Sequence, residues 1–308
     1  MKIAAIDIGS NALRLLIKDC AQHDMLATLD SLGEGEYYER VPLKSSMDVF
    51  AEGRILPPTK IKLTLALCHF AQMMKSYGVT DYRAVATSAY RDAANGQEVL
   101  TAAGRESGLR VEIISGDEEA RLTRLSFQPP QEWAKDYFVF VDVGGGSTEL
   151  SVVHQGQLIY GHSFQVGSMR YLCANQHPEQ EQALDRKVDE IYHTLAPIHY
   201  IATGGCVKFM SKYLSKKDER GGATTTKGCI EVSRMKEVYA DLLTKTVSQI
   251  VEHYRLPEER ADILTPACSV FLRIAGGLKA EHIHVPSIGV RNGIMAELYA
   301  RHCNEVVE

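Results

Sequence analysis

The sequence contains no continuous apolar run of about 18 residues, the length from which a membrane-spanning helix is inferred. A signal peptide is not expected either, because Asp7 interrupts the first apolar stretch and no small-residue cleavage site follows it. An excess of positive charge is also missing: the formal net charge is −5 at pH 7, which argues against general nucleic-acid binding. These absences favour a cytoplasmic protein that binds neither membranes nor nucleic acid.

Several chemical signatures are missing as well. The seven cysteines are scattered without a Cys-x-x-Cys pair, so we expect reduced thiols. No zinc spacing occurs, and His282 and His284 are spaced for one face of a strand, where we interpret them as structural. The Gly-x-Ser-x-Gly elbow of serine hydrolases and the Gly-x-x-x-x-Gly-Lys-Ser/Thr phosphate loop are absent, which disfavours both classes.

The most informative segment that is present reads VFVDVGGGSTEL, residues 139–150. Its apolar, β-branched start predicts a buried strand, which three consecutive glycines cannot continue. Glycines let the backbone turn with its N–H groups open to an anion. Because Asp142 would repel a bare phosphate, the segment predicts a phosphate site with a cation such as Mg²⁺ between the two.

A second segment, IAAIDIGSN at residues 3–11, has the same order of apolar run, Asp and Gly. Another apolar run follows each copy, so both predict a β-hairpin with Asp and Gly at its tip. A single Asp-x-Gly is weak support for a site, since turns contain these residues often. Two copies in one context indicate two related halves that face a shared cleft.

The two hairpin tips supply the first candidate ligands. Asp7 and Asp142 are candidate metal-binding carboxylates, although each could instead cap its own turn. The hydroxyl groups could bind phosphate, satisfy the hairpin locally, or do both. The candidate phosphate-binding residues are Gly9, Ser10, Asn11, Gly144, Gly145, Gly146, Ser147 and Thr148.

Two further carboxylates have competing interpretations. Ser115 and Glu118 fit the Ser-x-x-Glu capping box, which explains their spacing without any catalytic role. In the catalytic alternative, Glu118 orients and deprotonates a water that attacks phosphorus. Glu149 follows the glycine turn, within reach of a phosphate there, and could equally be a solvated strand residue.

Basic residues near these motifs are candidate phosphate ligands. Arg14 and Arg91 suit phosphate because the planar guanidinium can bind two oxygens at once, and surface ion pairs are the alternative. The turn at Gly204 and Gly205 opens a helix, and helix N-termini attract anions. In that helix Lys208, Lys212 and Lys216 share one face, which could follow a polyanion or be an ordinary solvated face.

The element pattern predicts an α/β protein, and 308 residues favour two domains. We expect helices over 60–77, 89–105 with a break near Gly96, and 117–127. Strands are expected over 81–87, 137–160 and 200–203, and a mobile polar loop over 215–227. We predict domains at 1–126 and 127–308, with the hinge at Pro129 and Pro130 and the last helix, about 291–308, packing back on the first domain.

Four ordered motifs resemble one family. They are DIGSN (7–11), ATSAYR (86–91), ISGDEEAR (114–121) and DVGGGSTEL (142–150), and weaker matches follow at 167–168, 204–205 and 287–293. Together they are similar to the exopolyphosphatase/guanosine pentaphosphate phosphohydrolase (Ppx/GppA) family in a short two-domain form. That family belongs to the actin, Hsp70 and sugar-kinase superfamily. The resemblance implies two ribonuclease-H-like domains, each a mixed sheet with flanking helices, with the active site in the interdomain cleft.

The resemblance also implies an activity and residue roles. It implies Mg²⁺-dependent hydrolysis, with Mn²⁺ as the alternative ion, of the terminal phosphoanhydride of polyphosphate or of guanosine pentaphosphate. Glu118 would be the catalytic base, Asp142 and Glu149 would hold metal and water, and Arg14 would contact phosphate. A homodimer is a further implication. The rival hypotheses are a kinase of the same superfamily and a nucleotide-binding sensor without catalysis.

Overall fold

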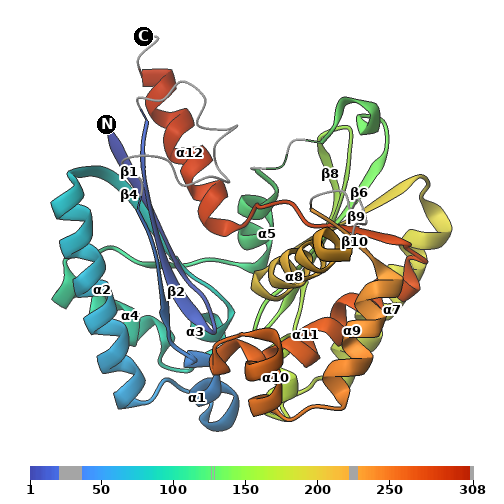
Figure 1. Cartoon of the computed structure of the whole chain (residues 1–308). Coiled ribbons are helices and arrows are strands. Elements are labelled where there is room, and N and C mark those ends of the chain that lie inside the picture. Colours follow the sequence, from blue (N-terminus) through green and yellow to red (C-terminus); the bar gives the residue numbers. More distant parts are fainter. Residues whose placement is uncertain (21–36, 126, 128, 222–227, 306–308) are drawn as a thin grey trace. The chain divides into compact units, whose positions relative to one another are not determined.

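The computed structural model describes residues 1–20, 37–125, 127, 129–221 and 228–305 of the chain (Figure 1). It consists of two compact units: Met1–Phe127 with Ile288–Glu308, and Gln128–Ser287. The predicted division at 126/127 assigned the last segment to the second domain. In the structure this segment belongs to the first unit. As the sequence predicted, its helix packs back on that unit, against β1 (Lys2–Ile8), β4 (Val79–Ala86) and α5 (Gly116–Leu125).

The first unit is built on a five-stranded mixed sheet. Its order is β3-β2-β1-β4-β5, in which β1 is antiparallel to β2 and parallel to β4. Register is continuous from the antiparallel pair Lys2–Asp19 to the pair Ile8–Leu13, so β1 and β2 form the predicted hairpin. The strands are β1 (Lys2–Ile8), β2 (Ala12–Asp19), β3 (Tyr37–Pro42), β4 (Val79–Ala86) and β5 (Glu112–Ile113).

Helices cover both faces of this sheet (Figure 1). The predicted end of the long helix at Gly78 is confirmed, since Gly78 adopts φ 72°, a left-handed cap. The predicted break near Gly96 is also confirmed: a Cβ at Gly96 would lie 2.0 Å from the Tyr90 carbonyl oxygen, so two helices meet there closely. The helices are α1 (Ser45–Glu52), α2 (Pro57–Tyr77), α3 (Ser88–Asp92), α4 (Gly96–Ser107), α5 (Gly116–Leu125) and α12 (Val290–Glu305).

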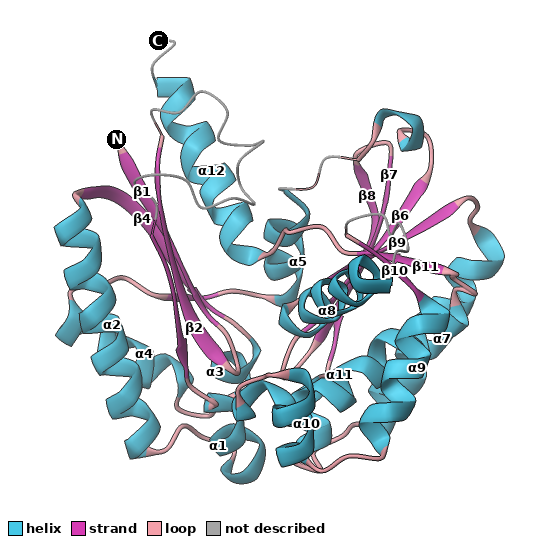
Figure 2. Cartoon of the chain, in the orientation of Figure 1, coloured by secondary structure: helices cyan, strands magenta, loops and turns pink. Residues whose placement is uncertain are grey.

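The second unit repeats this plan on a six-stranded sheet of order β10-β11-β9-β6-β7-β8 (Figure 2). Within it, β8-β7-β6-β9-β11 has the same pairing directions as β3-β2-β1-β4-β5. The strands are β6 (Tyr137–Val143), β7 (Thr148–His154), β8 (Gln157–Phe164), β9 (Ile198–Thr203), β10 (Cys229–Glu231) and β11 (His282–His284). The prediction of two related halves, each a mixed sheet with flanking helices, is therefore confirmed.

Helices of the second unit follow three of these strands. A short 3₁₀ turn, η1 (Gln131–Trp133), precedes β6. The helices are α6 (Ser168–Leu172), α7 (Pro178–Thr194), α8 (Gly205–Gly221), α9 (Val232–Leu243), α10 (Val247–Tyr254) and α11 (Glu258–Gly277). Within the described ranges no helix is long and apolar enough to cross a membrane.

The predicted polar loop over 215–227 is wrong in its first part. Helix α8 continues to Gly221, and residues 222–227 lie outside the described residues. The run of Lys, Glu and Arg there is polar, but these residues are good helix formers. Polarity alone therefore did not mark the end of the helix.

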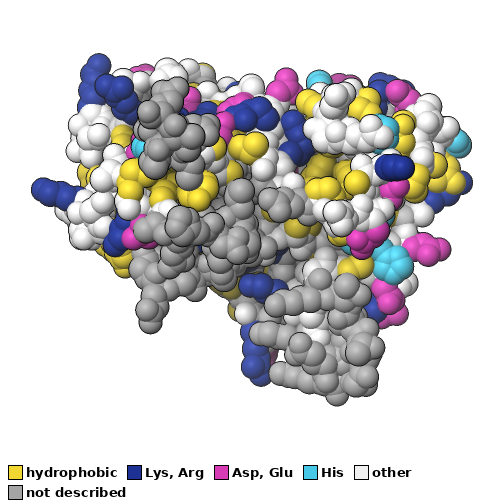
Figure 3. Space-filling model, turned by 90° about the horizontal axis from the view of Figure 1, so that it is seen from above, with side chains coloured by type: hydrophobic (Ala, Val, Ile, Leu, Met, Phe, Trp, Pro, Cys, Tyr) yellow, Lys and Arg dark blue, Asp and Glu magenta, His cyan; other side chains and the backbone are white. Residues whose placement is uncertain are grey.

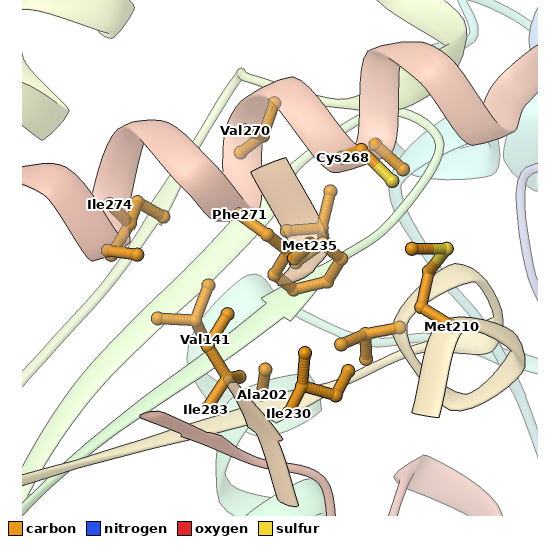
Figure 4. Packing of buried hydrophobic residues seen from close by; sticks show 14 of the residues in the cluster. Val141, Ala202, Met210, Ile230, Met235, Cys268, Val270, Phe271, Ile274 and Ile283 are labelled. Atoms are coloured by element: carbon orange, nitrogen blue, oxygen red, sulfur yellow. The ribbon is translucent and has the colours of Figure 1, made fainter. Parts of the chain in front are cut away.

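The core of the second unit lies on one face of its sheet. Val139, Val141 and Val143 alternate along β6, so their side chains share that face, and all are buried. Helices α7, α8, α9 and α11 cover it, and Met210 and Phe271 pack with Val141 in the same cluster (Figure 4). This packing fixes β6, the strand that leads into the glycine turn.

In the first unit, α12 and α5 complete the core together. Ile3 and Ala5 of β1 pack with Leu122 of α5 and Ile294 of α12. The two helices also approach closely at Gly293, where a Cβ would lie only 1.9 Å from the Leu122 carbonyl oxygen. The C-terminal helix is thus part of the support for α5.

Gly293→Ala is expected to destabilise the protein by roughly 1–3 kcal/mol, because the added methyl group has no space beside Leu122 and forces α12 away from α5. Gly276→Ala is the matched control, since a Cβ at Gly276 in helix α11 meets nothing within 4 Å. Urea unfolding of both variants measures the effect. Equal stability of Gly293→Ala and wild type would contradict the close contact.

Candidate active site

The two hairpin turns have the same backbone pattern. The Gly9 amide donates to the Ala12 carbonyl at 3.0 Å, and the Gly144 amide donates to the Ser147 carbonyl at 2.9 Å. In each hairpin an Asp of the outgoing strand lies opposite a charged residue of the return strand. In the first unit Asp7 is opposite Arg14. In the second unit, Asp142 is opposite Glu149.

The charges differ between the two hairpins. Arg14 Nη1 donates to Asp7 Oδ2 at 2.8 Å, so the Asp7 carboxylate already has a cationic neighbour. Asp142 and Glu149 are instead two carboxylates opposite each other, and opposed residues have Cβ atoms about 4.5–5.5 Å apart on one face. Like charges at that spacing repel unless a cation lies near. The second hairpin is therefore the better candidate metal site.

The hydroxyl of the first turn serves the local structure. Ser10 is 5% exposed, and its Oγ lies 2.8 Å from Ser88 Oγ at the start of α3. The Ser10 carbonyl accepts from the amide and the hydroxyl of Ser46, and the Asn11 carbonyl accepts from the Leu43 amide. The turn is thus fastened to α1 and α3, and the Ser10 hydroxyl contacts α3 and not its own hairpin.

The carbonyl groups of the three glycines in the second turn point toward helix α6. The Gly144 and Gly145 oxygens accept from the amides of Ser168 and Met169 at 3.0 and 2.8 Å. The Gly146 oxygen accepts from Arg170 Nε at 2.6 Å.

The amides of this turn point the other way. In a trans peptide the C=O and the N–H point in opposite directions, so the amides of Gly145, Gly146 and Ser147 face away from α6. Within the described part of the chain these three amides donate no hydrogen bond to other protein groups. Successive N–H groups on one side of a turn are a candidate anion-binding site.

The side chains of this turn have internal partners. Ser147 Oγ donates to Glu149 Oε1 at 2.6 Å, and Ser163 Oγ donates to the same oxygen at 2.8 Å. Thr148 Oγ1 donates to the Val166 carbonyl at 2.5 Å. Glu149 is only 3% exposed, so it is a buried, oriented carboxylate and not a solvated strand residue.

The third glycine turn lies beside Asp142. Gly204 has φ 110°, and a Cβ there would lie 3.2 Å from Asp142 Oδ1 and 3.1 Å from the Val143 carbonyl oxygen. Glycine is required at this position both by its dihedral angle and by this approach. In the described ranges no group of three or more His, Cys, Asp or Glu side chains could hold a metal. A Mg²⁺ site built from one or two carboxylates, waters and phosphate oxygens does not need such a group.

The lysine stripe is only partly described. Lys208 is half-buried in the first turn of α8, where its amide donates to the Gly204 carbonyl at 3.3 Å. Lys212 is exposed, and the side chain of Lys216 lies outside the described residues. At the start of the same helix, a Cβ added to Gly205 would meet nothing within 4 Å. Figure 3 shows Lys and Arg side chains interspersed with Asp and Glu over the face in view, so positive charge there is local.

Glu118 is held by two arginines. Arg121 Nε donates to its Oε2 at 2.6 Å and Arg83 Nη2 donates to its Oε1 at 2.9 Å. Both arginines also bind Glu297 of α12. The two Arg121 hydrogen bonds, aided by the one from Arg83 and opposed by burial, lower the pKa of Glu118 to about 2. The Ser115 hydroxyl accepts from the Glu118 amide, which confirms the cap, but the carboxylate is not bound back to the cap backbone.

Its neighbour Glu119 has different surroundings. Its side chain is 14% exposed, and Oε2 lies 3.6 Å from Arg91 Nη1. Arg91 also donates to the Ile114 carbonyl at 2.8 Å and belongs to α3, the helix that begins at Ser88 beside Ser10. Adjacent helical residues are about 100° apart, so the pair Glu118 and Glu119 must face different partners. The sequence could therefore have shown that the two acids point in different directions, but not which of them faces Arg91.

A pH dependence of stability follows from the lowered pKa of Glu118. A carboxylate with a depressed folded-state pKa stabilises the protein above its unfolded-state value of about 4.5 and loses this contribution as the pH falls toward about 2. We expect Glu118→Gln to lower stability at pH 7 by about 1–2 kcal/mol, allowing for solvent screening, and to flatten the stability profile between these pH values. Urea unfolding across that range tests this, and a profile as steep as that of wild type would contradict it.

Two residues behind the glycine turn, Gly167 and Arg170, have a role that the sequence motifs did not predict. A Cβ at Gly167 would lie 2.4 Å from the Gly145 carbonyl oxygen, so only glycine lets α6 approach the turn. Arg170 binds the Gly146 carbonyl from the same helix. The short motif at 167–168 was a sequence signal for Gly167, but nothing in the sequence indicated Arg170.

Two mixed sheets of one topology, each with a glycine turn after its first strand, define a two-domain protein of the actin-like ATPase fold. The model of the Ppx/GppA phosphatase family matches residues 39–302. The chain therefore belongs to the Ppx/GppA phosphatase family.

Named relatives agree with this family. Exopolyphosphatase 1 of Mycobacterium leprae is 30% identical over 151 residues, 49% of this chain and 42% of the relative. Exopolyphosphatase 2 of Mycobacterium tuberculosis is 33% identical over 180 residues, 55% of this chain and 53% of the relative. The chain thus spans about half the length of the curated relatives it matches.

Solved structures show the same fold. The crystal structure of an exopolyphosphatase from Cytophaga hutchinsonii has a TM-score of 0.80 at 17% identity, covering 98% of each chain. The structure of the Aquifex aeolicus member of the Ppx/GppA family has a TM-score of 0.71 at 20% identity, also covering 98% of each chain.

Proposed function

We propose that this protein is a Mg²⁺-dependent phosphoanhydride hydrolase that releases orthophosphate from the end of inorganic polyphosphate. The observation that supports this most is the glycine turn of the second unit, whose three amides face away from α6. Backbone amides suit phosphate oxygens because they stabilise negative charge without adding a titratable group. Membership of a phosphatase family that includes exopolyphosphatases favours hydrolysis over phosphate transfer to an acceptor.

In the second unit, Asp142 and Glu149 are the proposed metal-binding pair. Their opposed, same-face carboxylates fit a divalent cation with waters and phosphate oxygens as its remaining ligands. Such a metal, Mg²⁺ or Mn²⁺, would supply charge stabilisation at the phosphoryl oxygens. Ser147 and Ser163 hold the Glu149 carboxylate in one orientation.

In the first unit, we assign the two neighbouring acids different roles. Glu118, the base implied by the family resemblance, has three guanidinium hydrogen bonds and a pKa of about 2, so it is a weak proton acceptor. Glu119 is therefore the better candidate for the group that orients and deprotonates water. Glu118 instead connects α5 to α12 through the two arginines.

Phosphate release decides between the substrates. Purified protein with Mg²⁺ should release orthophosphate from polyphosphate faster than from guanosine pentaphosphate, with no release in EDTA. The reverse preference would make it a guanosine pentaphosphate phosphohydrolase. Tight nucleotide binding without turnover of either substrate would indicate a sensor and overturn the proposal. The cleft location of the site, the cytoplasmic location and the homodimer stay predictions.

A further inference from the structure

A buried arginine lies directly behind the glycine turn. Arg170 is 4% exposed, and its Nε donates to the Gly146 carbonyl at 2.6 Å. Its Nη1 donates to Asn175 Oδ1 at 2.7 Å and to His177 Nε2 at 3.1 Å. One planar group therefore connects the turn to the segment that follows α6.

The neighbours of Arg170 hold its guanidinium in place. A guanidinium only donates hydrogen bonds, so the His177 Nε2 must accept and carries no proton in this contact. The other ring nitrogen, Nδ1, lies 3.3 Å from Glu179 Oε1, which suits a proton on Nδ1. In addition, the Asn175 amide donates to the Arg170 carbonyl at 2.8 Å. The side chain and the backbone of Arg170 are thus fixed together.

The contact with Gly146 controls the next amide. Because C=O and N–H of a trans peptide point in opposite directions, the direction of the Gly146 carbonyl sets that of the Ser147 amide. In the same way, the Ser168 and Met169 amides of α6 hold the Gly144 and Gly145 carbonyls, which sets the directions of the Gly145 and Gly146 amides. The last of the three peptide planes, between Gly146 and Ser147, is thus held by the Arg170 side chain. Because glycine permits a wide range of dihedral angles, this plane could rotate if that contact were lost.

We propose that Arg170 is a positioning residue that orients the glycine-turn amides for a phosphate oxyanion. The inference rests on the proposed function only in taking phosphate as the anion. The buried positive charge of Arg170 also raises the electrostatic potential at the turn. Lysine cannot replace it, because a single ammonium cannot match the planar fork that meets Gly146, Asn175 and His177 together.

Orthophosphate binding tests the proposal without requiring turnover. Isothermal titration calorimetry with inorganic phosphate and Mg²⁺ should show a Kd about tenfold higher for Arg170→Lys, the effect expected from losing one charge-assisted hydrogen bond. The KM for polyphosphate should rise in proportion. Arg186→Lys, an exposed arginine of α7, is the matched control and should bind as wild type does.

A second variant covers the case in which Arg170→Lys does not fold. Asn175→Ala removes a contact to the guanidinium without touching the turn and should raise the Kd about threefold. A wild-type Kd in folded Arg170→Lys, or in Asn175→Ala, overturns the proposal, as does a wild-type protein that binds no orthophosphate. Wild type that binds orthophosphate but hydrolyses nothing overturns the proposed function alone, because the Kd comparison still stands.

Discussion

Glu119→Gln should lower kcat for orthophosphate release by about 10²–10⁴-fold, the usual contribution of a general base. The amide keeps the size of the side chain and removes its ability to accept a proton. A change in stability is measured beside it, because the mostly buried Glu119 carboxylate also contacts Arg91 at 3.6 Å. The pH–rate profile and a thermal unfolding curve of the same preparation measure both effects.

Glu118→Gln is the matched control for this variant. It makes the same chemical change one residue earlier, but at a carboxylate engaged by Arg83 and Arg121. We expect a loss of stability and a decrease in kcat of no more than about tenfold, because proton transfer is not removed. If Glu118→Gln abolishes turnover and Glu119→Gln retains it, the base is Glu118 and the assignment is reversed.

Asp142→Asn should lower kcat/KM at least about 100-fold, since a bound metal contributes several kcal/mol of charge stabilisation at the phosphoryl group. The Mg²⁺ concentration for half-maximal activity should rise as well. Asp142 is opposite Glu149 and beside Gly204, so its loss leaves a single carboxylate at the turn.

Binding of Mg²⁺ gives a readout separate from activity. Calorimetric titration of Mg²⁺ in the presence of orthophosphate should show weaker binding in Asp142→Asn. Asp189→Asn, whose side chain is 72% exposed on α7, is the control and should match wild type. Equal Mg²⁺ affinity in all three proteins would refute the assignment of Asp142 as a metal ligand.

Much of the fold could be predicted because its signals are local. An apolar run that ends in Asp and Gly is typical of a strand and a turn, and both hairpins confirm this at Asp7 and Asp142. Gly78 ends α2 because a left-handed residue favours glycine. Such features depend on a few neighbouring residues and on their periodicity.

What could not be predicted depends on contacts between distant segments. The four ion pairs that join Glu118 and Glu297 to Arg83 and Arg121 connect β4, α5 and α12. No spacing in the sequence indicates that Glu118 faces the C-terminal helix. The same holds for Arg170, whose partner Gly146 is 24 residues away.

The candidate site could be predicted in part. The sequence identified the glycine turn and its carboxylates, and the structure added their orientation. Whether Ser147 and Thr148 bind phosphate or the protein could not be read from residue types, because a hydroxyl suits both. Their short hydrogen bonds to Glu149 and to the Val166 carbonyl favour the protein, which is why the amides are the proposed phosphate donors.

Orthophosphate release by wild type and Asp142→Asn, with Mg²⁺ and with EDTA, is the direct test of whether this protein is a metal-dependent phosphoanhydride hydrolase. Polyphosphate is the substrate and guanosine pentaphosphate is assayed beside it. We expect rapid release from polyphosphate by wild type with Mg²⁺, and release at or near background in the other three conditions. Release that is unaffected by EDTA and by Asp142→Asn, or no release from either substrate, would contradict it.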